Sequence, residues 1–83
     1  MGILLIESVQ ENDSGVVITG SPVARRSLDE VTALWAAVQA AREDSGSEYK
    51  AAMENYRSLV GRPISLVFPN GSPIFKPGQV YFH

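Results

Sequence analysis

The residues able to carry acid–base or nucleophilic chemistry are few in this sequence and lie far apart. Its 83 residues include no Cys and one His, which is His83 at the last position. A general base must be held within hydrogen-bonding reach of the proton that it removes, and a side chain at a chain end is rarely held in this way. The serines therefore lack a partner for a catalytic triad, and no thiolate nucleophile is present. We expect the protein not to be an enzyme.

Metal and cofactor sites are equally poorly supported. Acidic residues occur in pairs at predicted turns or helix ends, namely Glu11/Asp13, Asp29/Glu30 and Glu43/Asp44. The stretch 11–15 is similar to an oxygen-rich calcium loop, but its glycine comes one position early and the acid at the twelfth position is missing. No glycine-rich loop precedes a Lys-Ser or Lys-Thr pair, as phosphate binding requires. We therefore expect no metal, no cofactor and no small-molecule substrate.

A nucleic-acid surface is the next possibility. Arg25 and Arg26 precede a predicted helix, Arg62 and Lys76 flank predicted strands, and the aromatic residues nearby are of the kind that stack on bases. Against this, the net charge is −2, whereas nucleic-acid-binding domains carry a basic patch. The alternative is that the aromatic residues fill a core and that the arginines are solvated or pair with acidic residues. Because the net charge is negative, we do not expect a nucleic-acid partner.

The element that organises the chain is a predicted helix over residues 28–43. Its apolar residues recur at three- and four-residue steps, and Trp35, the only Trp, lies at the middle of this face. Ser27 and Glu30 have the spacing of a capping box. A second amphipathic helix is predicted over 48–60, with Ser47 or Ser45 as its cap and Gly61 as its C-terminal glycine. Residues 27–60 should then form an antiparallel helical hairpin.

Strands are predicted on both sides of the helices. Residues 1–19 should form a hairpin of strands 3–9 and 16–19 around a turn that ends at Gly15, and the continuous apolar run at 3–6 indicates cover on both sheet faces. Residues 63–83 should form a proline-rich ribbon, in which Asn70-Gly71 joins strand 64–68 to a return strand over 74–75 and 79–82. The predicted fold is one α+β domain, 1–83, of order ββααββ, with the helices on one sheet face.

The terminal ribbon carries more apolar side chains than one edge hairpin needs. We take a set of five as candidate interface residues: Val67, Ile74, Phe75, Tyr81 and Phe82. The alternative is a small core that contains them all. If they form an interface, a charge at Phe75 or Tyr81 should abolish assembly and leave the fold intact.

Size and composition favour an interaction protein. Charged residues are 19% of the chain, below the usual quarter, and a domain this short gains stability from partners. We expect a non-enzymatic structural protein, a homo-oligomer or a component of a larger assembly such as a viral or bacteriophage particle. The alternatives are a regulatory module that sequesters one protein partner, and a structural subunit of an enzyme. Without a signal peptide or membrane span, we expect it in the cytoplasm or a virion.

Overall fold

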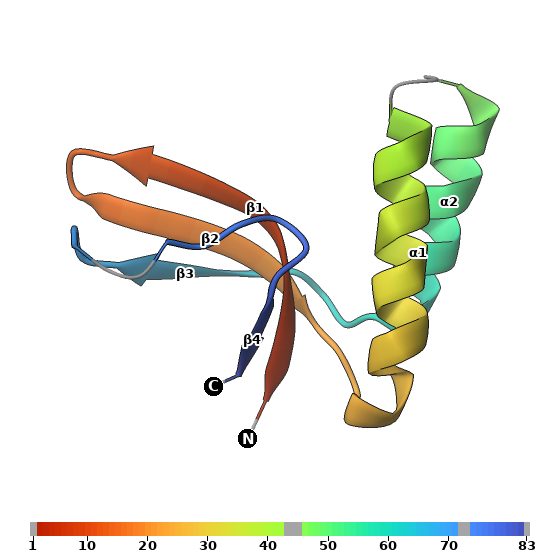
Figure 1. The fold of residues 1–83 in the computed structure, drawn as a ribbon, viewed down its shortest axis with the longest axis horizontal. Coiled ribbons are helices and arrows are strands. Elements are labelled where there is room, and N and C mark those ends of the chain that lie inside the picture. The colour runs from red at the N-terminus through yellow and green to blue at the C-terminus, as the bar shows by residue number, and fades with distance from the viewer. Residues whose placement is uncertain (1, 43–45, 72–73, 83) are drawn as a thin grey trace.

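The computed structural model describes residues 2–42, 46–71 and 74–82. They form an α+β fold with the predicted order of elements, strand–strand–helix–helix–strand–strand (Figure 1). The elements are β1 (Ile3–Asn12), β2 (Gly15–Pro22), a short 3₁₀ turn η1 (Arg25–Ser27), α1 (Leu28–Ala41), α2 (Ser47–Leu59), β3 (Ile64–Phe68) and β4 (Val80–Phe82). The first two strands are longer than predicted, and the predicted end of the first helix at Glu43 lies outside the described residues.

All four strands belong to one antiparallel sheet, in the order β3-β2-β1-β4. The predicted hairpin between β3 and the return strand is therefore wrong, because these two strands lie at opposite edges. Gly71 does adopt a positive φ of 91°, but the chain after this turn crosses to the free edge of β1. There Gly78 N donates to Ile6 O and Ile6 N donates to Gln79 O. β2 offers β3 a five-residue ladder, which the proline-interrupted return segment cannot match.

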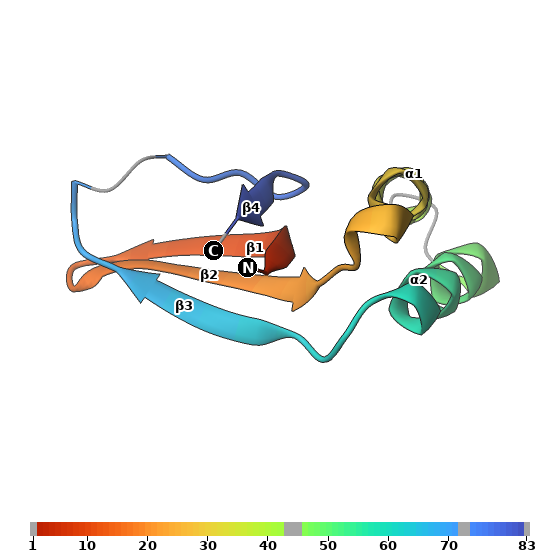
Figure 2. The ribbon, with the colours of Figure 1, turned by 90° about the horizontal axis from the view of Figure 1, so that it is seen from below.

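The helices lie side by side as the predicted hairpin and stand beside one end of the sheet (Figures 1 and 2). They cover this end rather than a whole sheet face, and the β1–β2 hairpin projects away from them. Short connections explain the arrangement: residues 23–27 lead from β2 into α1, and residues 60–63 lead from α2 into β3. Both connections leave the same end of the sheet, so the helices cannot lie far from it.

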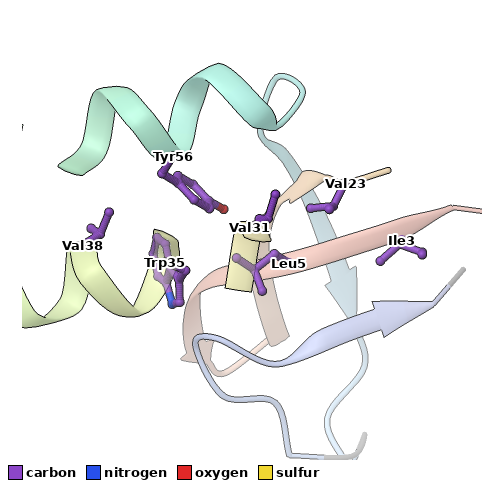
Figure 3. Packing of buried hydrophobic residues seen from close by; sticks show 7 residues of the cluster. All are labelled: Ile3, Leu5, Val23, Val31, Trp35, Val38 and Tyr56. Atoms are coloured by element: carbon purple, nitrogen blue, oxygen red, sulfur yellow. The ribbon is translucent and has the colours of Figure 1, made fainter. Parts of the chain in front are cut away.

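The apolar run at the start of β1 is covered on both faces, as predicted, and Ile3, Leu4, Leu5 and Ile6 are all buried. Ile3 and Leu5 belong to the core that the helices share with this sheet end (Figure 3). Successive side chains of a strand alternate between the two faces, so Leu4 lies on the sheet face opposite to that of Ile3 and Leu5. Its partner on β4 is Tyr81. The predicted core faces of both helices are confirmed, with Val31, Trp35, Val38 and Tyr56 buried.

The helix ends differ from the predictions. Ser27 makes no side-chain capping bond, since the η1 turn precedes α1 and the backbone N–H of Leu28 donates to the carbonyl of Arg25. Helix α2 begins after Gly46 with no side-chain cap, and Ser45 lies outside the described residues. At its other end, Val60 is already extended, and the N–H of Gly61 donates to the carbonyl of Pro22. Backbone turns and interstrand contacts thus replace the predicted caps.

Candidate functional site

Two of the five candidate interface residues pack against the protein itself. The ring centroids of Phe75 and Tyr81 lie 4.9 and 5.8 Å from that of Phe68, and 6.0 Å from each other. All three residues are half-buried. These edge and tilted contacts are those of a packed aromatic cluster. We therefore expect a charge at Phe75 or Tyr81 to weaken the fold itself, whereas the sequence alone predicted that the fold would stay intact.

The other three candidates are exposed to solvent. The relative exposures of Val67, Ile74 and Phe82 are 71%, 79% and 55%, and Ile64 at 40% joins them as an apolar residue that the sequence did not single out. They do not form one surface. Val67 lies beside Val17 in the sheet, whereas Phe82 lies opposite Ile3 at the far edge. Ile74 belongs to the segment that links β3 to β4.

Phe82 and Ile64 lie on the two opposite edge strands of the sheet, β4 and β3. Together with Ile3, Val23 and Arg25 they line an open depression with a volume of about 710 Å³. The lining is mainly apolar, and Arg25 is its one charged residue. A depression of this kind can accept an apolar side chain from another molecule, but it presents no group that could act on a substrate.

β3 is an edge strand with an unusual composition for its position. No strand among the described residues pairs with its outer side. Its five residues, Ile64–Phe68, include no charge, and prolines lie immediately outside it at positions 63 and 69. Soluble proteins protect exposed edges with charges, bulges or prolines within the strand, because unpaired backbone groups recruit further strands. We call this strand with its unpaired side the β3 edge.

A buried polar cluster joins the sheet to α2. The carboxylate of Glu7 accepts hydrogen bonds from Ser21 Oγ at 2.5 Å, from Tyr56 Oη at 2.6 Å and from both terminal nitrogens of Arg57 at 2.9 Å. Arg57 also donates to Ser21 Oγ at 2.9 Å. We call these four residues the Glu7 cluster. Leu5 is directly opposite Ser21, so strand alternation puts Glu7, two residues further along β1, on the same face as Ser21; the pairing slips immediately after it, between Ile6 and Ser8.

The chemistry of the Glu7 cluster is structural. Burial raises the pKa of Tyr56, and the hydrogen bond to the Glu7 carboxylate adds to the shift, so this hydroxyl stays protonated. Both carboxylate oxygens already accept hydrogen bonds, and Ser21 is fully buried. A substrate therefore has no route to the serine oxygen. The cluster ties β1, β2 and α2 together, and a carboxylate directly after a four-residue apolar run was its only sequence signal.

The described residues offer little support for a metal site, a nucleic-acid surface or a membrane span. Across 2–42, 46–71 and 74–82, no group of three His, Cys, Asp or Glu side chains could hold a metal ion. Arg25, Arg26, Arg62 and Lys76 are exposed on three separate segments, while three of the aromatic residues expected to stack on bases stack on one another. No helix in the described part of the chain is both long and apolar enough to cross a membrane.

Comparisons with protein-family models, with curated proteins and with solved structures find no match to this chain. The β3 edge and the exposed apolar residues around it are thus the features from which a function can be argued.

Proposed function

We propose that this protein is a non-enzymatic subunit that associates with other protein chains through the β3 edge. The observation that carries the proposal is the composition of this edge, which is uncharged over Ile64–Phe68 and exposes Ile64 and Val67. An exposed edge strand that is apolar and free of charge favours pairing with another strand.

The binding free energy available at this edge is enough for a weak contact, or for a stable one that is repeated many times in an assembly. Full burial of a Val or Ile side chain contributes about 1.5–3 kcal/mol, so covering the exposed parts of Ile64 and Val67 would contribute about 2–3 kcal/mol in total. Main-chain hydrogen bonds along the edge add a smaller net amount each. An assembly that repeats the contact many times multiplies this small gain.

A structural role also fits the polar groups of the chain. In the Glu7 cluster, the carboxylate oxygens of Glu7 accept hydrogen bonds from other residues of the same chain, Ser21, Tyr56 and Arg57. Such a cluster stabilises a fold but offers no free acid, base or nucleophile. We further propose that the assembly is a symmetric one, of which a viral or bacteriophage particle is an example. A regulatory module that sequesters one protein partner is the competing function.

The experiment that tests the proposal is sedimentation velocity over a wide concentration series. We expect the weight-average mass to rise with concentration. The control is Ser8→Lys, which places a charge at an exposed position on β1, two strands away from the β3 edge, and should leave the rise unchanged. A strictly monomeric protein at every concentration would contradict self-assembly and favour a module that binds one different chain.

A further inference from the structure

We infer that two copies of this chain pair through their β3 edges, antiparallel and about a two-fold axis that passes at Leu66. This inference rests on the proposed function and deepens it, because it names both the partner and the register. The result would be one continuous eight-stranded sheet, with β3 of each copy at its centre.

The register follows from the prolines. Pro63 and Pro69 lie three residues before and three residues after Leu66. A proline has no N–H to donate, so it cannot lie within a ladder. If Leu66 is opposite Leu66 of the second copy, each proline is opposite a proline and the ladder occupies all five residues between them. Every other antiparallel register places a proline of one copy opposite a strand residue of the other and shortens the ladder.

The other sheet edges are less suitable. β4 is only three residues long, Val80–Phe82. The outer side of β1 beyond β4 includes Glu11, and a charge within an exposed edge disfavours pairing with another strand. β3 carries no charge, and in the inferred register the exposed Ser65 of one copy is opposite the exposed Val67 of the other. β3 is therefore the longer of the two edge strands, and it can meet its own copy without repulsion.

Charges at the ends of the strand are complementary under the same symmetry. Arg62 precedes β3 at one end, and Asn70 follows it at the other, where its side-chain amide donates to the carbonyl of Asp13 at 2.8 Å. The register that centres on Leu66 places position 62 opposite position 70. Arg62 of each copy would thus lie next to Asp13 of the other copy, and both residues are exposed. Opposite charges at an interface rim favour this orientation.

The bulky part of each copy does not obstruct this pairing. The helices stand beyond the end of the sheet at which β3 begins, and the opposite end carries the β1–β2 hairpin and the turn that follows β3 (Figures 1 and 2). An antiparallel pair places the two helical hairpins at opposite ends of the joint sheet, so they stay apart.

The register can be read by disulfide trapping, because the chain has no Cys of its own. We would mix equal amounts of Ser65→Cys and Val67→Cys, oxidise the mixture and weigh the covalent dimers by mass spectrometry. Directly opposite residues have Cβ atoms about 4.5–5.5 Å apart, whereas identical residues across this two-fold are diagonal neighbours about 7–8 Å apart. We expect the mixed disulfide to exceed the half that random pairing gives. Ser8→Cys, at an exposed position on the same sheet, should form no dimer above the random-collision background.

A charge at the edge provides an independent measurement. Val67→Lys should raise the dimer dissociation constant measured by sedimentation at least about tenfold, because a two-fold interface contains the substituted residue of both copies. Val67→Thr keeps a β-branched side chain and should dimerise within about threefold of the original protein. Circular dichroism and urea unfolding confirm that both variants fold.

The outcomes separate this inference from the proposed function. Dimerisation with an enriched mixed disulfide and loss in Val67→Lys supports both. Association that Val67→Lys leaves unchanged, or disulfides in the random proportion, overturns the β3 register while the proposal of an interaction subunit stands. A monomer at all concentrations overturns the inference and self-assembly together.

Discussion

Arg57 donates one hydrogen bond from each terminal nitrogen to the two carboxylate oxygens of Glu7, both at 2.9 Å, although 50 positions separate them in the chain. The pair connects α2 to the bulge of β1, and Tyr56 and Ser21 donate to the same carboxylate. Within the part of the chain that the structure describes, it is an ion pair that links the helices to the sheet. Bidentate contacts of this kind fix orientation as well as distance.

The first prediction concerns the charge of Glu7. Glu7→Gln should lower the free energy of unfolding by about 2–3 kcal/mol, because buried donors of Ser21 and Tyr56 lose a charged acceptor. The loss should stay below that of a fully buried ion pair, since Arg57 is partly exposed and water can reach it. Urea unfolding followed by Trp35 fluorescence measures this. Glu11→Gln, exposed on the same strand, should change stability by less than about 0.5 kcal/mol.

The second prediction concerns pH and Tyr56. Burial and the Glu7 hydrogen bond raise the pKa of the folded-state hydroxyl above the value of about 10 that it has in an unfolded chain. Its contribution is therefore complete below that pH and is lost as the pH rises above 10, where only the unfolded chain releases the proton. Tyr56→Phe should be less stable by about 1 kcal/mol at neutral pH. The gap between the two proteins should narrow from about pH 9 to about pH 11. Parallel stability profiles of the original and Phe proteins would contradict this link.

The third prediction compares two glycines with positive φ. A Cβ at Gly15, where φ is 144°, would lie 2.2 Å from the carbonyl oxygen of Phe68. Gly15→Ala should therefore cost about 2–4 kcal/mol, because the backbone of β2 or β3 must shift. Gly71, with φ of 91°, has open space where a Cβ would lie, so Gly71→Ala should cost only about 1 kcal/mol of backbone strain. Thermal unfolding of the two variants gives the comparison, and equal losses would argue against close packing at Gly15.

The fourth prediction separates core from surface among the C-terminal apolar residues. Phe75→Ala removes a ring that contacts both Phe68 and Tyr81 and should cost about 2–4 kcal/mol, less than a fully buried Phe would. Val67→Ala removes an exposed side chain and should cost less than about 1 kcal/mol in the monomer. Urea unfolding at low concentration, where association is minimal, makes this measurement. A larger loss of unfolding free energy for Val67→Ala would show that the Val67 side chain stabilises the monomer despite its exposure.

Local patterns in the sequence determined the elements of this fold. The apolar spacing around Trp35 predicted α1 and its buried face, and the spacing around Tyr56 predicted α2. The run at 3–6 indicated a strand covered on both faces, which the burial of Leu4 and Leu5 confirms. These signals are local because a helix or strand repeats its buried side at a fixed period.

Tertiary structure decided which strands meet and which polar groups pair. The turn at Asn70-Gly71 reverses the chain, but it does not determine which strands pair. β3 pairs with β2, and β4 pairs with β1 at the other edge of the sheet. The Glu7 cluster likewise depends on the packing of α2 against the sheet, which brings Tyr56 within hydrogen-bonding distance of Glu7 from 49 positions away. Such pairings are set by competition among edges and by long-range packing, and neither leaves a periodic signal in the sequence.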